Sequence, residues 1–230
     1  MSYANGPKIV TDGLVLCLDA GNSKSYPGTG TTWYDLSGNG NDLTLINGPT
    51  FTSSNGGGFI FDGVNDYAYR NIADCSSNFK SMSKWTAFVA MRHYETNTNW
   101  HQIMGFTDTQ NFIDYWYRAS TKYFHYNGGG GHDYTAVNLN NSGFSVWCHS
   151  IETGTNNSKF YRNGVLGDSY TPSYLNTVAT TNGFSIAKAP ENSLYHSNML
   201  VSTVYIYNRV LTANEVQQNY NALKGRYGLN

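Results

Sequence analysis

The stretch that decides the fold is VYIYNRVLTANEV, residues 204–216. It continues a segment, residues 199–207, whose side chains alternate between two faces with Ser202 as an interruption, as in a β-strand. It then reaches residues 212–215, TANE, the capping-box pattern in which Thr accepts a bond from the helix backbone and Glu returns one. The apolar residues that follow recur at helix spacing: Val216, Tyr220 and Leu223. With Gly225 as a stop, the chain is predicted to end in a strand and a helix that packs on an edge or end of a sheet.

Short apolar or alternating segments, separated by turn residues, predict further strands upstream. They cover residues 14–19, 58–62, 85–92, 102–106, 111–118, 144–151 and 184–187. The first is apolar from Leu14 to Leu18, which predicts burial on both faces. Asn-Gly, the dipeptide favoured in two-residue hairpin turns, occurs seven times, most clearly at Asn163-Gly164 between two strand-like runs. This pattern predicts an all-β fold: a two-sheet antiparallel jelly-roll sandwich with one C-terminal helix.

Composition agrees with many strands joined by tight turns. The 230 residues include 24 Gly, 28 Asn and 19 Tyr but only four Glu. Charged residues make up 13% and the net charge is −1, without the clustered Lys and Arg that nucleic acid or an anionic membrane would require. No apolar run reaches the ~18 residues of a membrane-spanning helix, so no membrane insertion is expected. Three cysteines at wide spacings are expected to be reduced and buried: Cys17, Cys75 and Cys148.

The domain organisation is predicted to be simple. No break in composition, long linker or repeat interrupts residues 12–228, so residues 12–230 are expected to form one domain. Residues 1–7 lack the basic start and apolar core of a signal peptide. Residues 1–11 are predicted to be a short N-terminal arm that docks onto a partner subunit.

Several motifs together resemble the concanavalin A-like, laminin-G or pentraxin-type domain. They are GLVLCLDAGN at 13–22, WYDLSGNGNDL at 33–43, FDGVNDY at 61–67, the Asn-Gly hairpin at 160–166 and the closing stretch at 204–216. The resemblance covers nearly the whole chain except residues 93–142, and it implies the same sandwich fold. It is weak for function, because this fold hosts lectins, adhesion modules, hydrolases and virion proteins.

The C-terminal segment NYNALKGRYG, residues 219–228, is similar to structural proteins of tailed phages. This resemblance implies a non-enzymatic bacteriophage virion protein, for capsid decoration or tail and fibre adhesion, that displays a lectin-like domain. Its expected partners are other virion proteins and a host-surface glycan, with copies repeated by virion symmetry after assembly in the host cytoplasm. A calcium-dependent carbohydrate-binding lectin and a glycoside hydrolase stay open as alternatives.

Hydrolysis of a glycoside usually needs two carboxylates ~5–9.5 Å apart across one sugar bond. None of the four glutamates stands two or four residues from another acid, and Glu215 is explained by helix capping. No catalytic residue is therefore predicted, although carboxylates from distant strands could still form a pair. Zinc chemistry lacks a His-Glu-x-x-His or Cys/His cluster. Cys148 and His149 are neighbours on a strand and point to opposite faces, so they cannot form a nucleophile pair.

Calcium is the metal that the resemblance implies, held by Asp, Asn and backbone oxygens at the rim of the sandwich. Three such side chains lie in one short turn: Asp62, Asn65 and Asp66. The alternative is a turn in which these side chains bond their own backbone. Other candidates with the same chemistry are Asp19, Asn22, Asp35, Asn39, Asn41 and Asp42.

Sugar binding would use aromatic rings that stack on pyranose faces, with polar groups that bond the hydroxyls. The candidate ligand-binding residues are Trp100, Tyr115, Tyr117, Tyr123, Tyr126, His132 and Asp133. The glycine run 128–131 would permit an open loop between them. Core aromatics on adjacent strands are the alternative, and exposed tyrosines would equally suit a protein partner.

Overall fold

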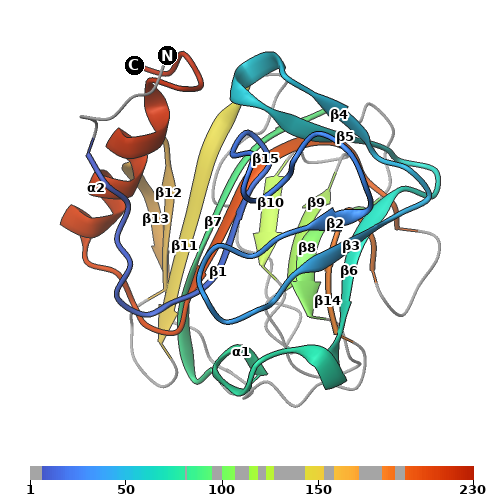
Figure 1. Cartoon of the computed structure of the whole chain (residues 1–230). Coiled ribbons are helices and arrows are strands. Elements are labelled where there is room, and N and C mark those ends of the chain that lie inside the picture. The colour runs from blue at the N-terminus through green and yellow to red at the C-terminus, as the bar shows by residue number, and fades with distance from the viewer. Residues whose placement is uncertain are drawn as a thin grey trace.

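The computed structural model describes residues 7–80, 82–94, 100–106, 114–118, 123–126, 143–152, 158–170, 183–189 and 195–230. These residues form two antiparallel sheets that pack face to face, with a helix outside them (Figure 1). The eight-stranded sheet has the order β13-β12-β11-β7-β15-β5-β4, and β1 also pairs with β15. The seven-stranded sheet has the order β10-β9-β8-β14-β6-β3-β2. The two-sheet antiparallel sandwich predicted from the sequence is confirmed.

The strands of each sheet and the helices have the following bounds. The eight-stranded sheet contains β1 (Leu14–Asp19), β4 (Thr50–Thr52), β5 (Gly58–Asp62), β7 (Lys84–His93), β11 (Ser145–Glu152), β12 (Ser158–Arg162), β13 (Val165–Tyr170) and β15 (Asn198–Tyr207). The seven-stranded sheet contains β2 (Thr32–Trp33), β3 (Leu43–Ile46), β6 (Tyr67–Asn71), β8 (Trp100–Phe106), β9 (Asp114–Arg118), β10 (Tyr123–Tyr126) and β14 (Gly183–Ile186). The helices are η1 (Ser54–Gly56), η2 (Ile72–Asp74), α1 (Ser77–Lys80) and α2 (Ala213–Lys224). No described helix has both the length and the apolar character to cross a membrane.

The main core lies between the two sheets and is rich in aromatic rings. Phe59, Phe106 and Phe184 are fully buried there, and the rings of Phe106 and Phe184 meet edge to face at 5.2 Å. Such contacts add specific geometry to the burial of large apolar surfaces. Many of the chain's aromatic side chains therefore fill the main core between the sheets.

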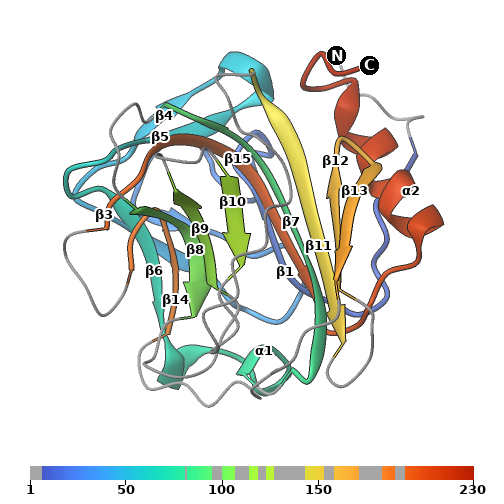
Figure 2. The ribbon, with the colours of Figure 1, turned by 180° about the vertical axis from the view of Figure 1, so that it is seen from behind.

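A second apolar layer lies between the outer face of the eight-stranded sheet and α2. On β7, Val89 points into the main core whereas Phe88 belongs to the outer cluster with Tyr220 and Leu223 of α2. The central strands are buried on both faces, which explains their continuous apolar sequences. Figure 2 shows α2 beside β12 and β13, covering this face. The predicted position of the helix on a sheet edge or end is therefore wrong, because its apolar stripe covers a sheet face.

A β-bulge in β15 changes which of its residues point into the main core and which point toward α2. The register with β7 shifts between Val201 and Thr203, so that an extra residue, Ser202, enters the strand. Val201 before the bulge and Val204 after it both face the main core, whereas Tyr205 faces α2. The alternation predicted along residues 199–207 holds on each side of Ser202 but switches face there.

The N-terminal segment from residue 7 onward packs on its own domain. The backbone N–H of Val10 donates to Asn219 Oδ1 at 2.8 Å, and the Tyr207 hydroxyl donates to the Val10 carbonyl at 2.9 Å. Gln218 Nε2 also donates to the carbonyl of Lys8 at 2.8 Å. Residues 7–11 of the predicted arm are therefore part of this domain. Side chains of α2 and β15 make hydrogen bonds to their backbone. The rest of the predicted arm lies outside the described residues.

The local predictions for the hairpin and the helix start are confirmed. Asn163 and Gly164 have φ values of 51° and 77°, as a two-residue turn between β12 and β13 requires. Thr212 and Glu215 form the reciprocal capping box at the start of α2. All three cysteines are free and buried.

Candidate binding site at one rim of the sandwich

Five strands of the seven-stranded sheet come to one rim of the sandwich, as their register shows. Tyr67 begins β6, and Lys188 follows the end of the neighbouring strand β14. Trp100 begins β8 and is paired with Arg118 at the end of β9, which is itself paired with Tyr123 at the start of β10. Strands stand about 5 Å apart, so β6 and β8 are roughly 10 Å from each other across this rim. The backbone alone therefore brings segments from distant parts of the sequence into one row.

Tyr67 is the centre of the described side chains at this rim. The Lys188 ammonium lies over its ring, 4.3 Å from the ring centre. The rings of His196 and Tyr69 lie at 6.1 Å and 6.5 Å from it. Tyr67 and Tyr69 are partly exposed on the same face of β6, separated by the buried Ala68. This arrangement offers two aromatic rings with a cation beside them.

The eight-stranded sheet completes the rim. Asn198 at the start of β15 pairs with Asp62 at the end of β5, and its carbonyl accepts the backbone N–H of Tyr94 at 2.9 Å. The Arg92 guanidinium lies 5.2 Å from the centre of the Tyr94 ring. A second tyrosine–cation pair thus lies where β7 ends. We call this end of the sandwich the Tyr67 rim, defined by Asp62, Asp66, Tyr67, Tyr69, Arg92, Tyr94, Lys188, His196 and Asn198.

The segment around His196 ties the two sheets together at the Tyr67 rim. The His196 carbonyl lies 2.8 Å from His101 Nδ1, and the Ser197 hydroxyl donates to the Gln102 carbonyl at 2.5 Å. Burial lowers the pKa of His196, assisted by the charge of Lys188, and this outweighs the opposing effects of the Asp66 backbone and the Asp62 carboxylate. The imidazole is therefore neutral at pH 7 and can both donate and accept a hydrogen bond.

The turn between Asp62 and Asp66 is held by its own hydrogen bonds. Asp62 Oδ1 accepts the backbone N–H groups of Val64, Asn65 and Asp66 at 2.8, 3.1 and 3.3 Å. Burial opposes ionisation of Asp62, but these three donors and His196 together lower the pKa of its carboxyl. Burial and the neighbouring Asp62 charge raise the pKa of Asp66. The side chain of Asp62 is therefore used as a turn cap, and calcium at Asp62, Asn65 and Asp66 stays a prediction.

The family follows from a comparison with protein-family models. Residues 61–217 match the model described as the concanavalin A-like lectin/glucanases superfamily. The chain belongs to this superfamily. No curated protein matches it.

Solved structures share the concanavalin A-like fold at low sequence identity. A sialidase of Trypanosoma rangeli, solved with the inhibitor DANA, is 15% identical with a TM-score of 0.69 over 96% of this chain and 34% of that chain. The binding domain of Paraclostridial Mosquitocidal Protein 1 is 14% identical with a TM-score of 0.72 over 95% of this chain and 56% of that chain. The concanavalin A-like chain thus spans about a third of the sialidase. At this identity the likeness shows the fold alone.

The prediction that Tyr115 binds a sugar is wrong. Tyr115 is fully buried between the sheets, where its hydroxyl lies 2.8 Å from His149 Nδ1 and accepts Trp85 Nε1–H at 3.4 Å. His149 Nε2 in turn lies 2.8 Å from the Ser158 hydroxyl. A ring inside this polar chain cannot stack on a sugar. Cys148 faces the outer cluster instead, which confirms that it cannot pair with His149.

The other predicted aromatic residues are placed only by their backbones. Trp100 and Tyr123 begin strands at the Tyr67 rim, and Tyr117 is paired with His101 one residue further in. Tyr126 is at the far end of β10. The side chains of these four residues lie outside what the structure describes, as do His132 and Asp133 entirely. The register thus brings three of the predicted residues to the same rim as the predicted calcium turn.

The remaining calcium candidates serve the loops around β1. The Asp35 carboxylate accepts the backbone N–H groups of Cys17, Ser37 and Asn41, and Asp42 accepts that of Asp35. Asn41 donates its side-chain amide to the Val15 carbonyl, and Asn39 does the same to that of Leu14. Asp19 is paired with Arg226, and Asn22 accepts the backbone N–H of Lys24. Over the described part of the chain, no group of three or more His, Cys, Asp or Glu is arranged to hold a metal ion.

Proposed function

We propose that this concanavalin A-like domain is a non-enzymatic module that binds carbohydrate at the Tyr67 rim. The observation that carries the proposal is the grouping of Tyr67 and Tyr69 with Lys188 and His196 where both sheets end. Partly exposed rings suit the apolar face of a pyranose, and the flanking donors and acceptors suit its hydroxyls. The binding-domain neighbour of the same fold supports a binding role.

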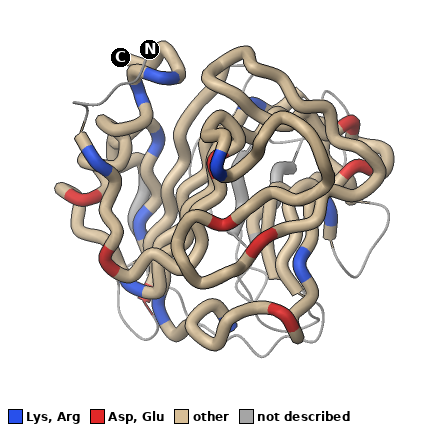
Figure 3. The backbone as a smooth tube through the Cα atoms, in the orientation of Figure 1, with Lys and Arg blue, Asp and Glu red and all other residues tan. Residues whose placement is uncertain are grey.

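The charges of the molecule suit a neutral ligand such as a sugar. Figure 3 shows acidic and basic positions on both the α2 side and the opposite side, so that neither sign dominates. The β5–β6 turn of the rim and α2 lie on opposite sides of the sandwich (Figure 1). Recognition at the rim would therefore rest on stacking and hydrogen bonds more than on net charge.

The roles of the described glutamates support binding without hydrolysis. Glu215 caps α2 and is paired with Arg209 at 2.6 Å, and Glu152 lies 3.6 Å from Lys84. Neither of these two carboxylates lies at the rim. The rim's own carboxylates, Asp62 and Asp66, lie in one turn, where Asp62 Oδ1 accepts three backbone N–H groups, whereas hydrolysis needs two free carboxylates across one sugar bond. Glu95 and Glu191 lie outside the described residues.

A glycan array tests the proposal, run with calcium and again with a chelator. Tyr67→Ala and Lys188→Met should each weaken the strongest signals by tenfold or more. Tyr34→Ala is the matched control, because Tyr34 is 43% exposed but follows the opposite end of β2 in the same sheet. Equal loss in all three variants, or no loss in the first two, would overturn the rim as the site. Mass spectrometry of the incubated glycans should find them intact, and shortened products would contradict a non-enzymatic role.

We further propose that the module is carried on a phage particle, as the C-terminal resemblance implies. Both described ends of the chain lie together on the α2 side (Figure 1), which suits a module attached at one end that presents the opposite rim. Cryo-electron microscopy of the particle should place density for this chain with its termini inward. Absence of the chain from purified particles would contradict this setting without affecting the rim.

A further inference from the structure

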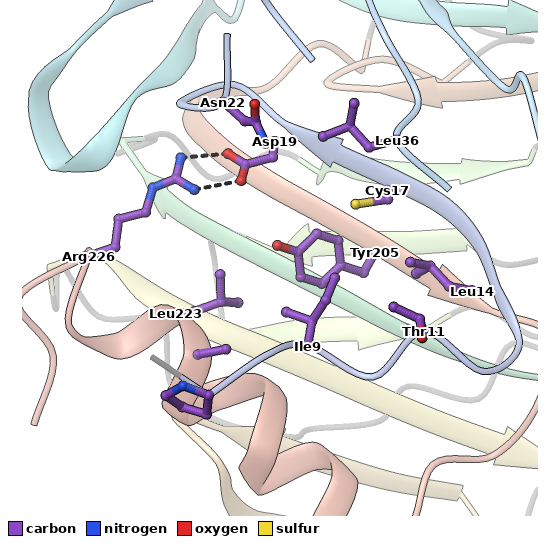
Figure 4. Close-up of a pocket in the computed structure, with 12 residues that line it drawn as sticks. Ile9, Thr11, Leu14, Cys17, Asp19, Asn22, Leu36, Tyr205, Leu223 and Arg226 are labelled. Carbon is purple, nitrogen blue, oxygen red and sulfur yellow. Dashed lines mark hydrogen bonds and ion pairs between the residues drawn. The ribbon is translucent and has the colours of Figure 1, made fainter. Parts of the chain in front are cut away.

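A groove lies on the α2 side of the molecule, far from the Tyr67 rim. It has a volume of about 400 Å³ and lies between the N-terminal segment, the outer face of β1 and the end of α2 (Figure 4). Its walls are mostly apolar and include Ile9, Leu14, Leu36 and Leu223. The volume falls within the usual range of small-molecule sites.

The charges at one end of the groove are already paired with each other. The Arg226 guanidinium meets the Asp19 carboxylate through two contacts of 2.7 and 2.6 Å, drawn as dashed lines in Figure 4. Arg226 also donates to the Gly56 carbonyl at 2.8 Å. A ligand with its own net charge would therefore find no uncompensated partner at this end.

The Tyr205 hydroxyl is different, because it has no hydrogen bond to any described residue. Tyr205 is only 3% exposed, and its ring lines the groove with the hydroxyl end toward Asp19 and Arg226 (Figure 4). The hydroxyl faces the groove, so a ligand atom can take the place of water as its hydrogen-bond partner. The groove thus combines an apolar wall with one hydrogen-bonding group that has no protein partner among the described residues.

We propose that this groove binds a neutral single-chain amphiphile. Its hydroxyl or amide head would bond the Tyr205 hydroxyl, and its alkyl chain would lie along Ile9, Leu14 and Leu36. The site is separate from the carbohydrate-binding rim, because the N-terminal segment, β1 and α2, which form the groove, contribute no residue to the rim.

The test is an NMR titration of the full chain with 1-hexanol, 1-heptanol and 1-octanol. Saturable shifts should appear at groove residues, with affinity rising about fourfold per added methylene. Tyr205→Phe should weaken each alcohol about fivefold, since it removes one hydrogen bond and leaves the ring in place. Ala222→Phe, which fills the groove from α2, should abolish binding. Gln217→Phe adds the same bulk on the exposed side of α2 and should leave binding unchanged.

Two results would overturn the proposal. One is the absence of saturable shifts for all three alcohols in the wild-type chain. The other is equal binding by wild type and Ala222→Phe, which would show that the alcohols bind elsewhere. Circular dichroism spectra of both Phe variants at α2 confirm that the helix and sheets are retained before either result is read.

Discussion

Replacing His149 should make the domain less sensitive to acid. The imidazole is buried between Tyr115 and Ser158, and it stacks on the Phe160 ring with centres 3.9 Å apart. None of these neighbours carries a charge that would favour an imidazolium. Burial lowers the pKa of His149 to about 3, whereas histidine in an unfolded chain has a pKa of about 6.5.

The sign and size of the effect follow from these two values. Between pH 6.5 and about 3 the unfolded chain binds a proton at His149 that the folded chain does not, so stability falls as the pH falls. The loss is about 1.4 kcal/mol per pH unit, or roughly 3 kcal/mol between pH 6.5 and 4.5. Above pH 6.5 both states are neutral at this group and the contribution is constant. His93, whose pKa is also lowered to about 3 by burial, adds a similar loss of its own.

Urea unfolding at pH 7.0 and 4.5 measures this loss. His149→Gln keeps a donor and an acceptor for Tyr115 and Ser158, and it should lose about 3 kcal/mol less than wild type between the two pH values. Ser158→Ala is the control: it breaks the same polar chain without removing a titrating group, so its cost should be equal at both pH values. If wild type and His149→Gln lose the same free energy on acidification, His149 is not the buried neutral base described above.

Three more predictions concern stability. Arg226→Met should cost about 3 kcal/mol by leaving the Asp19 carboxylate buried without its partner, and part of that loss should return in the double variant with Asp19→Asn. Strict additivity of the two changes in urea unfolding would contradict this coupling. Thr212→Ala should cost about 1 kcal/mol by removing the helix cap, seen as a lower Tm. Gly164→Val should cost about 1–2 kcal/mol, because Gly164 has φ +77° and a Cβ there would lie 2.8 Å from Tyr220; an unchanged Tm would refute that.

The sequence predicts the regular parts of the fold because their signals are local. The strand at residues 58–62 and the capping box at Thr212 and Glu215 are found where the pattern placed them. Local pattern also explains two failures. The segment at residues 7–11 has little periodicity, and its place is decided by Asn219 of α2 far along the chain. Which side chains of β15 face the main core depends on the β-bulge at Ser202, and the alternating sequence alone does not predict a bulge.

The candidate site was predictable only in part. The turn at residues 62–66 was visible as a motif, but its neighbours Lys188 and His196 come from distant segments and meet it through strand register. The spacing of Tyr67 and Tyr69 on either side of Ala68 could have predicted two rings on one face of a strand. However, β6 is too short to give a clear strand pattern. Tyr115 was misassigned because an aromatic residue on a strand has the same local sequence whether it faces the core or the solvent.

The central claim is that the Tyr67 rim is the binding surface, and an NMR titration with the strongest glycan from the array tests it most directly. The account predicts saturable shifts confined to the rim, including Tyr67, Lys188, His196 and Asn198, and their loss in Tyr67→Ala. Shifts confined instead to the α2 side, or a glycan affinity that survives Tyr67→Ala unchanged, would contradict it.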